Sequence, residues 1–378
     1  MIILQILEYG FAIIVGGLFG YQLLLSIFAL KGKKINGFAT TYNRRFVIAL
    51  VAHNKEKIIA KTLYSLYNLV YPKNLYDVVV IADNCSDDTA KISRSFGSVV
   101  IERSESQEIG TGYTLRWAID KIMDWDKNYD AVIIVNAESL VSGNYLEVMN
   151  YYLDKGSQVI QSSNLSFPQT GGWHNQINRL GLLLYNFVRP MGRKVLGFNT
   201  ELRGNGICLS TELLRKIPWK TWSLKEEVEY GLMLLLHGVS IDFAPEARVW
   251  GKYSSNIPNF RRYDCRQISR YPIIKKYAPK LLGAFFSEKA LRHFDTFIDL
   301  ITPSLKSTFS FVFLMCGLNV LLWKINWIPV QILWIWLMVA IVGVLHLIIG
   351  LYAAGEDREL YKSAVYIPLV AYCILSFM

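Results

Sequence analysis

The feature that most limits the fold of this chain is a set of uncharged stretches near its two ends, separated by a long polar middle. Tyr9–Leu30 contains no charged residue and is long enough to cross a bilayer as one helix. Ser307–Trp323, Trp327–Gly355 and Ser363–Met378 are similarly apolar, although the last is short for a membrane span. The sequence therefore predicts one membrane helix before the polar region and about three after it.

A cleaved signal peptide is the alternative for the first apolar stretch. Such peptides have a basic start and small residues at the cleavage site. Here Glu8 precedes the apolar run, no Lys or Arg stands before it, and bulky Phe28 and Leu30 lie at its end. These residues favour a retained membrane helix.

Basic residues indicate the orientation of the chain. Basic residues near a membrane helix stay on the cytoplasmic side, so we expect an integral protein of the cell (inner) membrane whose region 31–303 is cytoplasmic. The residues that set this orientation are Lys31, Lys33, Lys34, Arg44 and Arg45.

The formal net charge of +10 suits anionic membrane lipids or phosphate-bearing substrates. We expect no nucleic-acid partner, because the sequence contains no basic-aromatic motif and no recognition-helix pattern. The five cysteines form no CxxC pair, which argues against a zinc site or a disulfide framework.

The polar middle alternates apolar runs with segments of helical spacing. This alternation predicts an α/β fold with a doubly wound, mostly parallel sheet. The expected strands are Phe46–Ala52, Val78–Ala82, Ser98–Ile101, Ala131–Val135 and a glycine-containing Glu201–Leu209, and the expected helices are Glu56–Leu69, Gly112–Met123, Trp173–Val188 and Glu226–His237.

Ligands of such sheets bind beyond the carboxyl ends of the strands. The polar clusters at residues 53–56, 83–88 and 136–138 all follow expected strands. We therefore expect them to form one binding site.

The segment Tyr271–Leu305 mixes basic residues with Ile, Leu and Phe. This mixture favours amphipathic helices on the membrane surface, and the alternative is an ordinary helix packed against the domain. The expected division is an N-terminal transmembrane helix at 1–32, a cytoplasmic domain at 33–270, interfacial helices at 271–305 and transmembrane helices at 306–378.

Three motifs together give a family resemblance. They are VVVIADNCSDDTA at 78–90, RPMGRKVLGFNTELRGNGICLSTELL at 189–214 and SLKEEVEYGLMLLLHG at 223–238. In this order, between membrane helices, they resemble the membrane-bound family 2 glycosyltransferases with a GT-A fold, the group of cellulose-, chitin- and hyaluronan-synthase-like enzymes. The resemblance covers about residues 46–271.

The resemblance implies a donor-nucleotide pocket. Asp83 would hydrogen-bond the nucleobase, His53 and Asn54 would line the same pocket, and Glu56 would stand in the same turn. The family often has Asn-Glu-Glu there, whereas this chain has Asn54-Lys55-Glu56. We interpret the next polar residues, 87–89, as helix N-caps rather than site residues.

The family pattern Asp-x-Asp appears here as Asn136-Ala137-Glu138. Side chains two residues apart on a strand point the same way, so Asn136 and Glu138 could converge on one Mg²⁺ or Mn²⁺ ion. One formal negative charge is missing, so we expect weak metal binding. The alternative is that both residues are ordinary polar residues at the end of a strand and bind no metal.

The family's Thr-Glu-Asp appears as Lys225-Glu226-Glu227. By this resemblance Glu227 takes the position of the catalytic base, which would draw a proton from the acceptor hydroxyl. Glu226 has two interpretations that the sequence leaves open. It is either part of the site or part of a capping box with Ser223.

The acceptor side shows further departures. Gln-x-x-Arg-Trp appears as residues 267–271, where Gln267, Arg270 and Tyr271 would contact diphosphate and acceptor, unless Arg270 and Tyr271 are interfacial anchors. Gly204 and Asn205 belong to the acceptor-side segment. The family's Gly-Lys-Gly appears as residues 110–112 with Thr111 in the middle.

These departures leave two functional hypotheses. The first is a membrane-anchored inverting glycosyltransferase with a nucleotide-diphosphate sugar as donor and a lipid-linked or polysaccharide acceptor. The second is an inactive homologue that serves an active transferase as a scaffold or binding subunit. The presence of Asp83, Glu138, Glu227, Gln267 and Arg270 favours the first.

Overall fold

The computed structural model groups the chain into two compact units. The helical unit comprises 1–32, 168–197 and 298–378, and the sheet unit comprises 33–167 and 198–297. The structure describes residues 2–32, 35, 37–38, 41–105, 107–108, 110–167, 173–221, 223, 225–251 and 270–355. This grouping differs from the expected division, because residues 168–197 join the terminal helices and residues 271–297 join the sheet.

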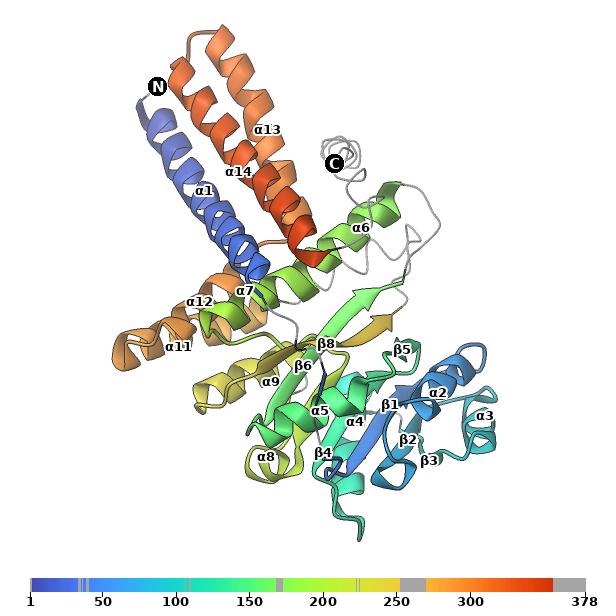
Figure 1. Cartoon of the computed structure of the whole chain (residues 1–378). Coiled ribbons are helices and arrows are strands. Elements are labelled where there is room, and N and C mark those ends of the chain that lie inside the picture. The colour runs from blue at the N-terminus through green and yellow to red at the C-terminus, as the bar shows by residue number, and fades with distance from the viewer. Residues whose placement is uncertain are drawn as a thin grey trace. The chain divides into compact units, whose positions relative to one another are not determined.

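The sheet unit is built on one eight-stranded sheet in the order β3-β2-β1-β4-β7-β6-β8-β5 (Figure 1). The four neighbouring strands β3, β2, β1 and β4 are parallel. Strand β7 lies between β4 and β6 and is antiparallel to both. The strands are β1 Phe46–Ala52, β2 Tyr76–Asp83, β3 Val99–Arg103, β4 Ala131–Asn136, β5 Ser139–Val141, β6 Val159–Ser166, β7 Ile207–Ser210 and β8 Asp242–Gly251. The prediction of a mostly parallel α/β sheet is confirmed.

Helices cover both faces of this sheet. They are α2 Ile59–Tyr67, η1 Lys73–Leu75, α3 Thr89–Ser95, α4 Thr111–Met123, α5 Tyr145–Asp154, α8 Thr211–Lys216, α9 Glu226–Leu236 and α11 Tyr271–Glu288. On β1, Phe46 and Ile48 face a core shared with α2 and α5, whereas Val47 and Ala49 face a core shared with α4 and α9. This alternation buries β1 on both faces, which is why its sequence is a continuous apolar run.

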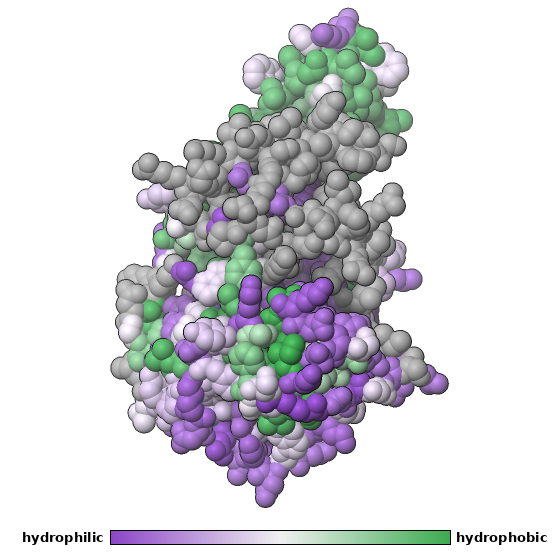
Figure 2. Space-filling view, turned by 90° about the vertical axis from the view of Figure 1, so that its right-hand side faces the viewer, coloured by the Kyte–Doolittle hydropathy of each residue, from purple (hydrophilic) through white to green (hydrophobic). Residues whose placement is uncertain are grey.

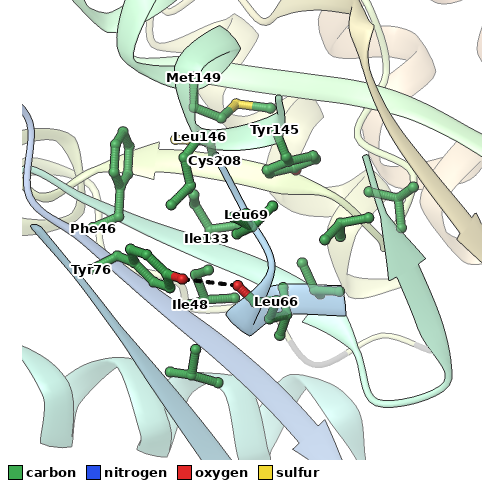
Figure 3. Close-up of a cluster of buried hydrophobic side chains, with 14 of the residues drawn as sticks. Phe46, Ile48, Leu66, Leu69, Tyr76, Ile133, Tyr145, Leu146, Met149 and Cys208 are labelled. Carbon is green, nitrogen blue, oxygen red and sulfur yellow. Dashed lines mark hydrogen bonds between the residues drawn. The ribbon is translucent and has the colours of Figure 1, made fainter. Parts of the chain in front are cut away.

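Figure 3 shows the first of these two cores. Ile48 and Ile133 lie in one cluster with Leu66, Tyr145 and Leu146, which come from α2 and α5. The hydroxyl of Tyr76 donates a 3.0 Å hydrogen bond to the carbonyl oxygen of Leu66. The one polar atom of this buried ring is thereby satisfied, as buried polar groups require.

The strand expected at Glu201–Leu209 is wrong over most of its length. Only Ile207–Ser210 forms a strand. Gly204 and Gly206 have φ values of +70° and +69°, which lie outside extended geometry and suit glycine. The segment before β7 is therefore a shaped loop.

The helical unit contains α1 Ile2–Leu30, α6 Trp173–Leu183, the π-helix η2 Leu184–Val188, α7 Arg189–Leu196, α13 Leu305–Lys324 and α14 Val330–Ala354. Among the described residues, α1, α13 and α14 are long and apolar enough to cross a membrane. Their exposed apolar side chains include Ile13, Leu321 and Trp334. Figure 2 shows the visible surface of these helices as mostly hydrophobic and that of the sheet unit as mostly hydrophilic. The expected span Ser363–Met378 lies outside the described residues.

Close packing and ion pairs hold the helical unit together. A Cβ on Gly192 would lie 2.3 Å from the carbonyl oxygen of Leu25, so α7 meets α1 at a position that only glycine fits. Arg189 and Arg193 both pair with the buried carboxylate of Asp299 on α12, Leu291–Ile301. Helices α11 and α12 confirm the helical prediction for this region, and their place on a membrane surface stays a prediction.

Glu8 is an ionisable residue inside α1, although the sequence placed it before the apolar run. The uncharged run begins at Tyr9, but the helix begins at Ile2, so Glu8 lies within it. Its buried carboxylate accepts hydrogen bonds from Trp336 Nε1 at 2.8 Å and from Asn319 Nδ2 at 3.3 Å. Glu8 therefore joins α1 to both α13 and α14.

We expect Glu8→Ala to lower the stability of the helical unit by about 1–3 kcal/mol, because it leaves the buried Trp336 N–H without its acceptor and removes one of the two acceptors of Asn319 Nδ2. The measurement is the thermal unfolding midpoint of the purified full chain in detergent. Gln5→Ala, on the same helix, serves as the control. Equal midpoints for Glu8→Ala and wild type would contradict the structural role of this carboxylate.

Candidate functional site

The carboxyl ends of β1, β2 and β4 meet at one edge of the sheet. Val51 pairs with Asn136, and Ala52 pairs with Ala82, so the residues that follow these strands start at the same level. His53 and Asn54 are exposed there, and His53 Nδ1 lies 2.8 Å from the carbonyl oxygen of Asp83. The predicted meeting of the three polar clusters is confirmed.

The turn after β1 is bonded to the turn after β2. Asn54, with φ of +49°, accepts a 2.8 Å hydrogen bond from the Ser86 amide through Oδ1. The Lys55 amide donates to Thr89 Oγ1 at 2.7 Å. Glu56 accepts from the Asp88 amide at 3.2 Å. Asn54 and Glu56, both predicted to contact the donor, thus use their side chains to brace this turn, and their contact with a nucleotide stays a prediction.

The residues interpreted as helix N-caps behave differently from one another. Asp87 accepts from the Thr89 amide at 3.0 Å and from the Glu56 amide at 3.0 Å. Burial raises the pKa of Asp87, but hydrogen bonds from Thr89 and the Glu56 amide outweigh it, so the pKa lies below its ordinary value. Asp88 occupies the N-cap position of α3 without a side-chain capping bond, so the capping prediction is wrong for Asp88.

The carboxylate of Asp83 is buried and held from two sides. Its Oδ1 accepts from Arg103 at 3.0 Å, and its Oδ2 accepts from the Thr114 hydroxyl at 2.7 Å. Arg103 lies opposite Asp83 in the β2–β3 register. Asp83 is therefore fixed in position at the end of β2 as a charged hydrogen-bond acceptor.

Sequence reasoning missed both of these partners of Asp83. Thr114 lies on α4 and Arg103 at the end of β3. The signal available in the sequence was that Arg103 follows the third expected strand by two positions, but only the pairing of β2 with β3 brings it to Asp83.

The end of β4 is fixed by Asn205. The Asn136 amide donates to Asn205 Oδ1 at 3.0 Å, and Asn205 Nδ2 donates to Ser139 Oγ at 3.0 Å. Gln161 Nε2 donates to the Asn205 carbonyl at 2.9 Å. Asn205 is buried in this network, so it holds the 136–139 turn, and its predicted contact with an acceptor stays a prediction.

The carboxylate of Glu138 forms an ion pair. Lys55 Nζ lies 3.3 Å from Glu138 Oε2. The only other ligand predicted for a metal, Asn136, offers a neutral amide. Within the described part of the chain, no three His, Cys, Asp or Glu side chains gather in a way that could hold a metal ion. One amide, and one carboxylate that already has a cationic partner, form a weak ligand set for a divalent cation, which would need water or phosphate oxygens to complete its coordination.

Glu227, the expected catalytic base, lies in the first turn of α9. Gly204 lies against Glu227, since a Cβ on Gly204 would be 3.2 Å from Glu227 Oε1. Gly112 lies against Glu226, since a Cβ on Gly112 would be 3.3 Å from Glu226 Cβ. The structure thus brings two predicted site residues, Gly204 and Glu227, together, and the absent side chain of Gly204 leaves space beside the carboxylate.

Of the two interpretations that the sequence left open for Glu226, the capping box with Ser223 is wrong. The N-cap of α9 is Lys225, which forms no side-chain capping bond, and not Ser223. The carbonyl of Glu226 accepts a 2.9 Å hydrogen bond from Thr221, and its buried side chain lies under Gly112. This packing lets α4 and α9 approach each other closely.

A carboxylate that the sequence did not single out, Glu229, ties α9 to α11. It accepts from Lys276 Nζ at 2.6 Å and from the Tyr277 hydroxyl at 3.2 Å. Burial raises the pKa of Glu229, but the hydrogen bonds, chiefly from Lys276, outweigh it and lower the pKa below its ordinary value.

Glu229 should therefore stabilise the fold above the ordinary glutamate pKa of about 4.3, and the contribution should be lost as pH falls through the lowered folded pKa. We expect Glu229→Gln to remove this part of the acid-induced loss of stability. The measurement is the unfolding midpoint of both proteins between pH 7 and pH 3. If the unfolding midpoints of the two proteins fell equally between pH 7 and pH 3, this role of Glu229 would be contradicted.

On the acceptor side, Arg270 is buried and paired. Its NH2 lies 3.1 Å from Glu201 Oε1, while Arg203 NH2 lies 3.7 Å from Glu201 Oε2. Two guanidinium groups thus share one carboxylate. Tyr271 is 68% exposed at the start of α11, and Gln267 lies outside the described residues. Contact of Arg270 or Tyr271 with a substrate stays a prediction.

The family follows from a match over most of the sheet unit. Residues 44–268 match the family described as glycosyltransferase like family 2, and this range covers more than half of the chain. The chain belongs to this family. The finer assignment to its cellulose-, chitin- and hyaluronan-synthase-like group stays a prediction.

Two curated relatives share part of the sequence. A probable glycosyltransferase, YdaM, of Bacillus subtilis is 24% identical over 274 residues, which are 68% of this chain and 61% of that protein. The beta-monoglucosyldiacylglycerol synthase of Trichormus variabilis is 26% identical over 166 residues, 42% of this chain and 34% of that protein. The chain thus spans about three fifths of the first relative and about a third of the second.

A solved structure shares the fold. The mannosyltransferase PcManGT from Pyrobaculum calidifontis, in complex with GDP-Man and Mn²⁺, superimposes with a TM-score of 0.56 at 14% identity. The superposition covers 93% of this chain and 99% of that protein. The expected GT-A fold is confirmed by this similarity.

Proposed function

We propose that this protein is a membrane-anchored, inverting glycosyltransferase that moves a sugar from a nucleotide-diphosphate donor to an acceptor hydroxyl. The observation that carries the proposal is the fixed Asp83 carboxylate at the carboxyl edge of the sheet, in the same unit as Glu227 beside Gly204. Family membership indicates the class of reaction. In the proposal, Asp83 binds the donor and Glu227 acts on the acceptor.

In the proposed reaction the acceptor oxygen attacks the anomeric carbon from the side opposite the diphosphate. A bond forms between that oxygen and carbon, while the bond from the carbon to the diphosphate oxygen breaks. The nucleoside diphosphate leaves with the bonding electron pair, and Glu227 takes the proton of the acceptor hydroxyl. Asp83 would orient the donor by accepting a hydrogen bond from its nucleobase.

A lipid-linked or polysaccharide acceptor is the proposed partner. Three helices among the described residues are apolar enough to cross a membrane, which supports an acceptor held in lipid, and the Trichormus relative is named for a glucosylated diacylglycerol. We place the protein in the cell (inner) membrane with the sheet unit in the cytoplasm, on the basis of the basic residues after α1. Addition of one or a few sugars fits the four spans that the sequence predicts better than polymer export.

The test is release of nucleoside diphosphate by the purified full chain in detergent. A panel of uridine- and guanosine-diphosphate sugars would be offered with membrane lipid extract, with and without Mn²⁺, because the sequence predicts a weakly bound Mg²⁺ or Mn²⁺ ion. We expect release from one donor that requires the lipid extract. Absence of release from every donor, together with absence of nucleotide binding by calorimetry, would favour the inactive scaffold that serves a partner transferase.

A further inference from the structure

The ion pair between Lys55 and Glu138 occupies the position where the family pattern has its metal-binding carboxylates. Lys55 lies in the turn after β1, and Glu138 lies in the turn after β4. Their charged atoms are 3.3 Å apart, and both side chains are about one-third exposed. The pair is therefore open to a ligand that approaches the carboxyl edge of the sheet.

The backbone on the Lys55 side is fixed by hydrogen bonds that do not involve its ammonium group. The Lys55 amide donates to Thr89 Oγ1 at 2.7 Å, and its carbonyl accepts from the amides of Ile58 and Ile59 at 2.9 Å each. The flanking Asn54 and Glu56 are tied to the turn after β2. The backbone of Lys55 is therefore fixed, and only its side chain extends toward Glu138.

The Glu138 side is fixed in the same way. The Thr62 hydroxyl donates to the Ala137 carbonyl at 2.9 Å. The buried Asn205 bonds the Asn136 amide on one side of Glu138 and the Ser139 hydroxyl on the other. Charged groups held in place before the ligand arrives need little reorganisation, which is the condition for efficient electrostatic stabilisation.

The charges of the pair match those of a metal site. Two aspartates with a divalent cation sum to zero, and Glu138 with Lys55 also sums to zero. An ammonium group carries three N–H donors, and among the described residues Glu138 engages one of those of Lys55, so two remain there to bond phosphate oxygens. Lysine binds phosphate as a compact point charge, and it needs no further acidic ligand to hold it in the site.

We propose that Lys55, positioned by Glu138, binds the diphosphate of the donor and supplies there the positive charge that a divalent cation supplies in Asp-x-Asp enzymes. This inference rests on the proposed function, because it requires a nucleotide-diphosphate donor. It explains why Asn136 stands where an aspartate is expected: with Lys55 present, a second carboxylate would give the pair a net negative charge facing an anionic ligand.

The experiment measures nucleotide binding rather than turnover. Binding of UDP and of GDP to the purified full chain in detergent is followed by calorimetry, first in EDTA and then with Mn²⁺. The variants are Lys55→Gln, Lys55→Arg and Lys57→Gln, the last being a control at an exposed lysine in the same turn. Thermal unfolding of each variant shows whether it is folded.

We expect wild type to bind one of the two nucleotides in EDTA and Mn²⁺ to change its affinity by less than about threefold. Lys55→Gln should weaken binding in EDTA by about tenfold or more, which corresponds to about 1.4 kcal/mol. Lys55→Arg should keep most of the affinity, and Lys57→Gln should match wild type. In Lys55→Gln, Mn²⁺ should now strengthen binding, because Glu138 is released as a ligand.

Two results would overturn the inference, and they are distinguishable. If wild type binds nucleotide only with Mn²⁺, and Lys55→Gln binds as tightly as wild type, a metal displaces Lys55 and the proposed function still stands. If wild type binds neither nucleotide with or without Mn²⁺, both the inference and the proposed function fail.

Discussion

Glu227→Gln is expected to lower kcat for sugar transfer by on the order of 10²- to 10⁴-fold, while donor binding changes little. Glutamine keeps the size and polarity of the side chain but cannot accept the proton of the acceptor hydroxyl. The neighbouring Gly204 has no side chain to restrict the group at this position, so the substitution should fit without rearrangement. The measurements are release of nucleoside diphosphate under saturating donor and calorimetric binding of the same nucleotide.

Two further variants make this result interpretable. Glu212→Gln, on the surface of α8, removes an exposed carboxylate paired with Lys216 and should leave kcat unchanged. Glu226→Gln tests the neighbouring residue, whose carboxylate is buried below Gly112. A larger loss of kcat in Glu226→Gln than in Glu227→Gln would move the base to Glu226 and contradict the assignment.

Three strands of the parallel half of the sheet, β1, β2 and β4, could be predicted from the sequence because they are buried on both faces, whereas most of β3 is partly or fully exposed. Strands β1, β2 and β4 therefore consist of continuous apolar runs, which have a clear pattern. The other half lacks that pattern. Strand β6 contains buried Gln161, Ser162 and Ser163, which look like a loop in the sequence.

Strand β8 could not be predicted from the sequence because it contains a bulge. It contains Pro245 and Glu246, and its pairing with β6 passes from Ala244 directly to Arg248. A proline inside an apolar run argues against a strand unless a bulge accommodates it. The sequence alone cannot show that bulge, because it depends on the register with a strand far away in the chain.

The same limit applies to the site. Each residue at the end of a parallel strand could be found, because the strand itself could be found. The charged partners of these residues are distant in the sequence. Lys55 and its partner Glu138 are 83 residues apart, and Arg103 and its partner Asp83 are 20 residues apart. The sequence therefore indicated the location of the site, but it did not reveal that the carboxylate of Glu138 is already paired.

Asp83→Asn should destabilise the sheet unit and weaken nucleotide binding at the same time. The side chain of Arg103 is only 4% exposed, so loss of the Asp83 charge leaves a buried guanidinium without its nearest counter-charge. Breaking a buried pair from one side costs on the order of 3–5 kcal/mol. Asp77→Asn, on the same strand, removes a carboxylate from a more exposed pair with Lys127 and should cost about 1 kcal/mol or less. The measurement is denaturant unfolding of all three proteins in detergent.

The double variant Asp83→Leu/Arg103→Met separates the two roles of Asp83. Replacing both members of a buried ion pair by apolar residues removes the unpaired charge, so stability should recover most of what Asp83→Asn loses. Nucleotide binding should not recover, because the acceptor for the nucleobase is still absent. Calorimetric titration of the folded double variant with UDP and GDP decides the point. Affinity equal to wild type would show that Asp83 only holds Arg103 in the fold, and the nucleobase contact would have to be sought elsewhere along the carboxyl edge of the sheet.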